Sequence, residues 1–237
     1  MRRTLSIALV ALTIALGCSS CLQTVGDTSR IEFVSTATVD GWRYDYFRNP
    51  AYPCSISGHQ TFVIGTKVGS SASTSAPLWV WLHGGGVGFF GANGSPKPDS
   101  NQMTEQSAAS LRGGVDNGGL AARIRSSPAG FRTLAVSYCN RDLYSGTGQV
   151  DPNNPNLNAD SSAKTTNGLL ATKAAIEFTR TTYPTGKFFV AGGSAGSVGS
   201  YYVSWALQLS GTAPAGIVGD ASVVNVAQGE AAAEQGA

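Results

Sequence analysis

The chain has 237 residues, two histidines and a formal net charge of +2, and only 13% of its residues are charged. This length suits one domain with a substantial core, and the charged fraction is well below the roughly 25% that is typical of soluble domains. The net charge equals that of Arg2 and Arg3, so removal of an export signal that contains them would leave a net charge of zero. No basic surface for nucleic acid is therefore expected.

Residues 1–18 have the pattern of an export signal. Arg2 and Arg3 precede a largely apolar run over 5–16, which is typical of the basic and apolar regions of a signal peptide. The run is shorter than the roughly 20 residues that cross a bilayer. Its end is similar to a bacterial lipoprotein box, in which lipidated Cys18 would attach the protein to a membrane, and simple cleavage nearby is the alternative. We therefore expect an exported protein, either secreted or periplasmic, or held at the cell surface by lipid.

The remaining chain is predicted to be a flexible tether over 19–29 and a single domain over 30–237. In the early part of the domain, β-forming residues alternate or cluster, which predicts antiparallel strands over 31–39, 43–47 and 61–68. Short apolar runs follow at 78–82 and 133–136. Such runs are typical of strands that are buried on both faces of a mostly parallel sheet.

Loops and helices separate these strands from the end of the chain. Long loops are predicted over 88–107 and 152–159, with one poor helix over 111–124 between them. A cleaner helix, a strand, a second helix and a further strand are then predicted over 166–182, 187–191, 195–209 and 215–218. This alternation implies right-handed crossovers, and hence a three-layer α/β sandwich around a mostly parallel sheet.

The pentapeptide Gly192-Gly193-Ser194-Ala195-Gly196 lies between a predicted strand and a predicted helix. A G-x-S-x-G sequence at such a junction forms a sharp elbow that exposes a nucleophilic serine. Gly192 and Gly196 would keep side chains away where the strand and the helix approach each other. The amide of Ala195, at the helix N-terminus, would donate to an oxyanion. The pattern therefore predicts Ser194 as a catalytic nucleophile.

A second glycine-rich segment, His83-Gly84-Gly85-Gly86, directly follows the apolar run at 78–82. It matches the H-G-G-G loops whose amides complete the oxyanion hole of lipases and esterases. Because His83 precedes the serine, we expect it to position this loop rather than to act as a base. The other histidine, His59, is expected to be structural or to lie at the surface.

No histidine follows Ser194, although in the α/β-hydrolase order both the acid and the histidine of the triad come after the serine. We therefore expect that neither the triad histidine nor the triad acid is present in this chain. Removal of the base from a serine triad leaves only the residual catalysis of the oxyanion site and substrate binding. The sequence predicts little or no turnover by these 237 residues alone.

Three segments together resemble the pectin acetylesterase and Notum family of carboxylesterases. They are the strand and glycine loop at 81–87, the run Ser-Tyr-Cys-Asn-Arg-Asp-Leu-Tyr-Ser-Gly at 137–146, and the serine segment at 192–197. The resemblance implies an α/β-hydrolase fold that is incomplete at its C-terminus. It also implies an ester substrate, either a small molecule or a polysaccharide that carries O-acetyl groups.

The resemblance also assigns roles to individual residues. Ser194 would be the nucleophile, and the amides of Gly86, Val87 and Ala195 would donate to the oxyanion. The family usually has a glutamate in place of His83 and a tryptophan in place of Val87. The second change keeps a backbone amide but removes a ring that would shape the acyl pocket.

The acidic residues near these motifs are given lesser roles. Asp142 precedes the serine, and the resemblance implies a structural role for it rather than that of the triad acid. Asp220 is the only aspartate after Ser194; the resemblance implies a pocket-wall residue, with the triad acid as the fallback. Glu230 and Glu234, in an alanine-rich tail, are interpreted as solvated charges.

Cys54 and Cys139 are the cysteines of the predicted domain. An exported protein could pair them, whereas a free buried cysteine would pack as a small hydrophobic residue. The histidines and cysteines have no metal-ligand spacing, and the glycines at 192–199 fit neither nucleotide-binding pattern. We therefore expect no metal and no cofactor. The alternative to an esterase is a non-catalytic, secreted or surface-anchored binding protein derived from a hydrolase.

Overall fold

The structure is a computed structural model that describes residues 25–69, 76–97, 103–116 and 119–220. The predicted export signal with Arg2, Arg3 and Cys18, and the tail with Glu230 and Glu234, lie outside the described residues. Within the described ranges, no helix is both long enough and apolar enough to cross a membrane.

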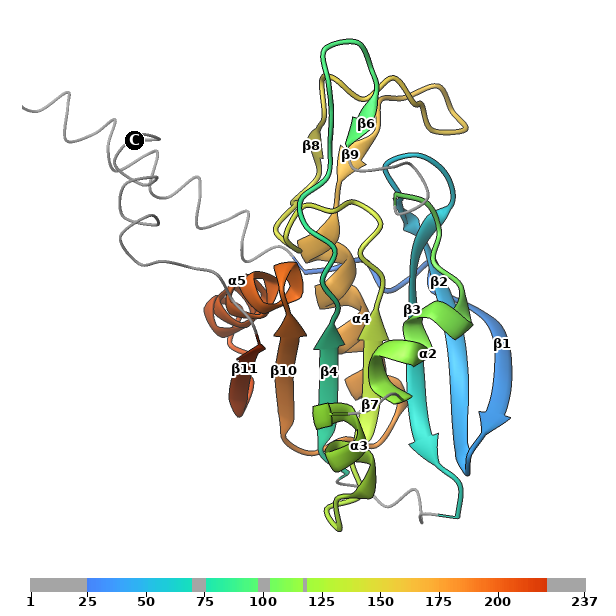
Figure 1. Cartoon of the computed structure of the whole chain (residues 1–237), viewed down its shortest axis with the longest axis vertical. Helices are drawn as coiled ribbons and strands as arrows, with labels where there is room; N and C mark the ends of the chain where they lie inside the picture. The colour runs from blue at the N-terminus through green and yellow to red at the C-terminus, as the bar shows by residue number, and fades with distance from the viewer. Residues whose placement is uncertain (1–24, 70–75, 98–102, 117–118, 221–237) are drawn as a thin grey trace, which may run out of the picture.

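A seven-stranded sheet forms the middle of the fold (Figure 1). In spatial order its strands are β1 (Glu32–Val39), β2 (Trp42–Pro53), β3 (His59–Lys67), β7 (Arg132–Val136), β4 (Leu78–Leu82), β10 (Phe188–Gly193) and β11 (Gly216–Asp220). The first three strands are antiparallel to their neighbours, and β3 pairs antiparallel with β7. From β7 to β11 all neighbours are parallel. The predicted antiparallel start and parallel continuation are both confirmed.

Helices cover both faces of this sheet. Helices α4 (Gly168–Thr182) and α5 (Ala195–Leu209) pack on one face, and α2 (Ala108–Asp116) and α3 (Gly119–Ser126) lie on the other (Figure 1). Successive strand residues point to opposite faces, so Leu78, Val80 and Leu82 pack toward α4 and α5, whereas Trp81 packs toward α2. The three-layer α/β architecture is therefore confirmed.

Element boundaries differ from the predictions mainly in the first half of the chain. The single poor helix expected over 111–124 is two short helices, and Gly119, with a φ of 52°, begins the second. The loops contain two small hairpins, β5 (Phe89–Phe90) with β6 (Pro96–Lys97), and β8 (Gln149–Val150) with β9 (Thr165–Thr166). By contrast, the strand at 78–82 and the helix at 195–209 have the predicted bounds.

The end of the predicted tether is packed against the domain rather than free. Gly26 is buried against α4, where a side chain would collide with the backbone of Ala174. The N–H of Asp27 donates to the hydroxyl of Tyr52, and its carbonyl accepts from the amide of Asn49 at 2.8 Å. Gly26 and Asp27 are therefore part of the packed domain, because close packing and backbone hydrogen bonds hold them.

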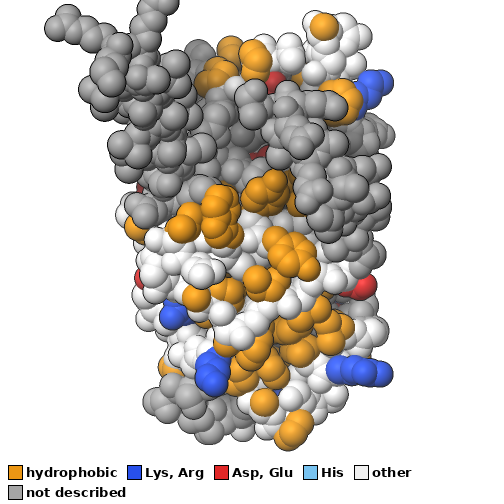
Figure 2. All heavy atoms as spheres, turned by 90° about the vertical axis from the view of Figure 1, so that its left-hand side faces the viewer, with side chains coloured by type: hydrophobic (Ala, Val, Ile, Leu, Met, Phe, Trp, Pro, Cys, Tyr) orange, Lys and Arg blue, Asp and Glu red, His pale blue; other side chains and the backbone are white. Residues whose placement is uncertain are grey.

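Hydrophobic side chains gather on the face formed by α5 and β11 (Figure 2). The exposed large hydrophobic residues there are Tyr201, Tyr202, Trp205 and Leu209 of α5 and Ile217 and Val218 of β11. Trp205 is 52% exposed and Ile217 is 42% exposed. Among the described strands β11 pairs only with β10, so this side of the sheet has an edge strand beside an apolar helix face.

Candidate active site

Ser194 occupies a strained turn between β10 and α5. Its backbone has a φ of 53° and a ψ of −120°, a conformation that is costly for a residue with a side chain. The strain persists because the backbone is held on both sides: the Ser194 N–H donates to the Asp220 carbonyl at 2.9 Å, and its own carbonyl accepts from the Ser197 N–H at 2.9 Å. The side chain is exposed and makes no helix-cap hydrogen bond. The hydroxyl is thus presented to solvent at the N-terminus of α5.

Close backbone packing around this turn requires glycine. A side chain at Gly192 would collide with the carbonyl of Gly196, and a side chain at Gly196 would collide with the carbonyl of Leu82. At Gly193 an added Cβ would lie 3.3 Å from the ring of Trp81, which supports the turn from the α2 side. Gly192 and Gly196 therefore lie where the strand, the helix and the end of β4 approach each other closely.

The triglycine segment lies against the serine. Strands β4 and β10 are adjacent and parallel, so the segments that follow them meet at the same edge of the sheet. A Cβ added to Gly84 would be 2.7 Å from the Cβ of Ser194. Gly85 and Gly86 have φ values of 154° and 73°, which a side chain would oppose. Gly86 and Val87 are exposed at this edge and Ala195 begins α5, while their role as oxyanion donors remains a prediction.

Residues 138–144 hold the carbonyl groups of this loop. Three of their side chains donate to three of its oxygens: Tyr138 to Gly86 at 2.9 Å, Tyr144 to His83 at 3.0 Å, and Arg141 to Gly85. Burial raises the pKa of Tyr138 to about 12, so its hydroxyl stays protonated and donates. Because these carbonyls are engaged on one side, the loop has a fixed conformation from which its amides can face a ligand.

The 138–144 segment is itself held in an unusual conformation. Arg141, Leu143 and Tyr144 have φ values of 53°, 56° and 57°, which are uncommon for residues other than glycine. The partly buried Asp142 carboxylate supports this backbone by accepting the N–H groups of Gly168 at 2.7 Å, Tyr144 at 3.1 Å and Gly146 at 3.2 Å. Burial raises the pKa of Asp142, and the backbone hydrogen bonds oppose that rise. Asp142 therefore has a structural role.

A disulfide between Cys54 and Cys139 fixes the same segment to the loop between β2 and β3. Both cysteines are fully buried. The alternative that these cysteines are free is therefore wrong. The bond connects parts of the chain that are 85 residues apart.

The two histidines lie in different surroundings. The His83 Nδ1 lies 2.7 Å from the Gly84 carbonyl oxygen, and its Nε2 lies 2.9 Å from Oε1 of Gln106. That same Oε1 accepts the N–H of Tyr138 at 2.6 Å. His83 therefore connects the loop to its support, and neither of these ring-nitrogen contacts is with the Ser194 hydroxyl. His59 begins β3, is partly exposed, and has its pKa lowered by burial.

Asp220 contributes its backbone carbonyl to the serine turn. Asp220 ends β11 opposite Gly193, and its carbonyl receives the Ser194 N–H. Its side chain is exposed. No group of three His, Cys, Asp or Glu side chains in the described ranges is placed to hold a metal ion.

A cavity of about 450 Å³ opens beside the triglycine loop. Its lining is mostly polar and comprises His83, Gly84, Glu105, Gln106, Ser107, Ser110 and Arg141. Gly84 belongs both to this cavity and to the contact with Ser194.

A serine on a strained strand-to-helix turn, beside a glycine loop on the neighbouring parallel strand, is the geometry of a serine-hydrolase nucleophile elbow. No protein-family model and no curated protein sequence matches the chain.

Solved structures of esterases and hydrolases do show a similar fold. They include a proposed acetyl xylan esterase from Bacteroides fragilis (13% identity, TM-score 0.44, 82% of this chain and 49% of that one). The cell-wall-degrading esterase LipA from Xanthomonas oryzae is 17% identical (TM-score 0.41, 77% and 46%). The S-formylglutathione hydrolase FrmB from Staphylococcus aureus is 13% identical (TM-score 0.37, 78% and 55%). The chain thus spans about half the length of these proteins.

Proposed function

We propose that this chain carries the nucleophile and oxyanion half of a serine ester hydrolase. The observation that carries the proposal is the exposed Ser194 hydroxyl on a strained elbow, in contact with Gly84 of the triglycine loop. The Ser194 Oγ would attack an ester carbonyl carbon, and its proton would pass to a base. The alcohol would then leave, and water would release the acid from the acyl-enzyme.

The oxyanion of each tetrahedral intermediate would be stabilised by backbone amides. The donors in this proposal are the N–H groups of Gly86, Val87 and Ala195. Two features support it. The carbonyls of Gly85 and Gly86 already accept hydrogen bonds from Arg141 and Tyr138. Ala195 is the first residue of α5, where helix amides point outward. Preorganised donors of this kind contribute about 10²–10³ in rate each.

The base is the part that the described residues do not supply. Both ring nitrogens of His83 are engaged, and His59 is placed at the start of β3. Serine enzymes that lose their triad keep about 10³–10⁴ of their acceleration over water. We therefore propose little or no turnover by these residues alone, and a complete site would need an acid and a histidine from additional polypeptide.

The finer proposal is an esterase of the pectin acetylesterase and Notum type, acting on O-acetyl groups of a polysaccharide or on another ester. It is supported by the three sequence segments, which meet in space: residues 83–87 are bonded to 138–144 and touch Ser194. The second candidate is a secreted or surface-anchored binding protein that has lost catalysis. The engaged His83 favours that candidate.

A fluorophosphonate probe separates the two candidates. An activated hydroxyl predicts that the protein is labelled and that Ser194→Ala is not. Ser197→Ala is the matched control, because the Ser197 hydroxyl is buried three residues away and has no hydrogen-bond partner among the described residues. Because the described residues supply no base, labelling should be slow, so the probe is used at high concentration with long incubation. If wild type is then labelled no faster than Ser194→Ala, the Ser194 hydroxyl is not activated by its surroundings; the esterase proposal for this chain fails and the binding-protein candidate stands.

We also propose that the protein works outside the cytoplasm, with a membrane attachment through lipidated Cys18 as one form. The buried Cys54–Cys139 disulfide supports export, because such bonds form and persist in oxidising compartments. Metabolic labelling with a palmitate analogue, compared between wild type and Cys18→Ala, would separate lipidation from simple cleavage.

A further inference from the structure

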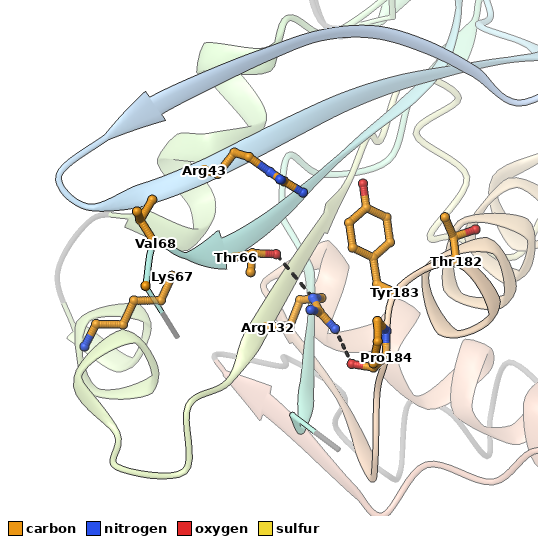
Figure 3. Close-up of a pocket in the computed structure, with 9 residues that line it drawn as sticks. Arg43, Thr66, Lys67, Val68, Arg132, Thr182, Tyr183 and Pro184 are labelled. Carbon is orange, nitrogen blue, oxygen red and sulfur yellow. Dashed lines mark hydrogen bonds between the residues drawn. The ribbon is translucent and has the colours of Figure 1, made fainter. Parts of the chain in front are cut away.

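A second cavity, drawn in Figure 3, lies at the end of the sheet where β7 begins. Arg132 is the first residue of β7, whereas Ser194 follows the last residue of β10, and the strands between them are parallel. The cavity has a volume of about 510 Å³. It lies between the starts of β2 and β7 and the ends of β3 and α4, so a ligand bound there is at the other end of the strands from the serine.

The lining of this cavity is positively charged. It contains Arg43, Lys67 and Arg132 and no acidic residue. The nearest described carboxylate partner is Asp45, which accepts from Arg43, from the Tyr183 hydroxyl at 2.8 Å and from Thr36 at 2.8 Å. Asp45 is therefore already surrounded by donors, and its charge is paired with that of Arg43.

Arg132 is the unusual member of this group, since it is only 3% exposed and no ion pair to it exists among the described residues. Its Nε donates to the Thr66 hydroxyl at 3.2 Å and its Nη1 donates to the Pro184 carbonyl. The guanidinium also lies 5.3 Å from the ring centre of Tyr183. These contacts fix the plane of the group, and they leave the second terminal nitrogen, Nη2, without a hydrogen bond to a described residue.

Arg43 faces the same space from β2 (Figure 3). Burial lowers the pKa of Arg132, and the charge of Arg43 lowers it further, which means that the two cations repel each other across the cavity. The ammonium of Lys67 points away from both guanidinium groups in Figure 3. Two fixed guanidinium groups on one cavity are a favourable setting for an oxyanion, because each can donate along its planar edge.

We propose that this cavity binds a small organic anion, with its phosphate, sulfate or carboxylate group between Arg43 and Arg132. The volume is within the range of about 300–1,000 Å³ that is usual for small-molecule sites, so a ring-sized body fits behind the anionic group. The Tyr183 ring and the aliphatic part of Val68 provide apolar surface for that body. The site would anchor or sense a ligand away from the candidate active site.

Isothermal titration calorimetry at low ionic strength tests the proposal with two probes of similar charge, inorganic phosphate and glucose 6-phosphate. We expect saturable one-to-one binding of glucose 6-phosphate. Arg43→Gln should weaken it about tenfold, which corresponds to the loss of one charge-assisted hydrogen bond. Arg132→Lys, which keeps the charge but loses the planar fork, should weaken it as well.

The control is Arg30→Gln, which removes an exposed positive charge near the opposite end of β1. It should leave the affinity unchanged. Should Arg132→Lys fail to fold, the exposed Arg43→Gln still decides the outcome. Equal affinity for both probes would assign the site to a free inorganic anion. The absence of saturable binding, or an equal loss in Arg30→Gln, would overturn the proposal, and neither result would bear on Ser194.

Discussion

Removal of the Cys54–Cys139 disulfide should lower the stability of the whole domain. The bond joins residues 85 apart in sequence. In the chain-entropy description, a cross-link that closes a loop of this length destabilises the unfolded state by about 4.6 kcal/mol at 25 °C. We expect the double variant Cys54→Ser, Cys139→Ser to lose most of this amount. Both cysteines are changed together, because a single change would leave a buried free thiol.

Thermal unfolding followed by circular dichroism measures the effect. For a domain of about 200 residues, 1 kcal/mol corresponds to about 2–4 °C in Tm, so the double variant should unfold about 9–18 °C below the oxidised wild type. Reductant should lower the Tm of the wild type toward that of the double variant, and it should leave the variant unchanged. This comparison separates the covalent bond from the change in side chain.

A Tm difference below about 2 °C would refute the reasoning, since the loop-closure account cannot yield so small a value unless the unfolded chain stays compact. The same variant should also report on the candidate site. Cys139 lies beside Tyr138, which holds the Gly86 carbonyl. If labelling of Ser194 is detected in the wild type, we expect it to slow in the variant even at temperatures where the variant is folded.

Three further outcomes are expected. Ser194→Gly should raise the free energy of unfolding by about 1 kcal/mol, because glycine relieves the positive φ, whereas Ser194→Ala should not; urea denaturation of both variants checks this. Gly196→Ala should lower the urea midpoint strongly, since its methyl group meets the Leu82 carbonyl, and an unchanged midpoint would contradict the close packing of the elbow. Burial raises the pKa of Glu105, but hydrogen bonds from Arg48 and the His59 N–H outweigh it, and the net pKa is below 4.5. Its carboxylate therefore stabilises the fold above about pH 4.5 and stops doing so as the pH falls, so Glu105→Gln should show a smaller loss of stability than wild type between pH 6 and pH 3.

The parallel part of the fold could be predicted because its signals are local. The run at 78–82 is apolar throughout, as a strand buried on both faces requires, and the helix at 195–209 begins where the elbow ends. Ser194 and Gly84 could also be placed near each other, because the loops after neighbouring parallel strands share one edge of the sheet. The weaker predictions fell where glycine and small polar residues dominate, as in the two short helices α2 and α3.

The support of the triglycine loop could not be read from the sequence in the same way. Tyr138, Arg141 and Tyr144 act through hydroxyl and guanidinium groups on backbone carbonyls more than 50 residues away. No periodicity or spacing encodes such contacts, since they depend on the left-handed backbone of a loop. The family resemblance includes residues 137–146, but it does not show which contacts these residues make. The sequence likewise does not decide whether Cys54 and Cys139 pair, because sequence alone gives no distance between two cysteines.

Trp81 is placed where its fluorescence can report on the serine elbow. Its indole lies between the elbow and α2, with the Gly193 backbone on one side and Gly114 on the other, where an added Cβ would be 2.8 Å from the ring. The chain has only four tryptophans. Replacing the other three by phenylalanine would leave one intrinsic fluorophore directly beneath the serine turn. Its emission would then follow ligand entry or loop movement at the elbow in real time, without any attached dye.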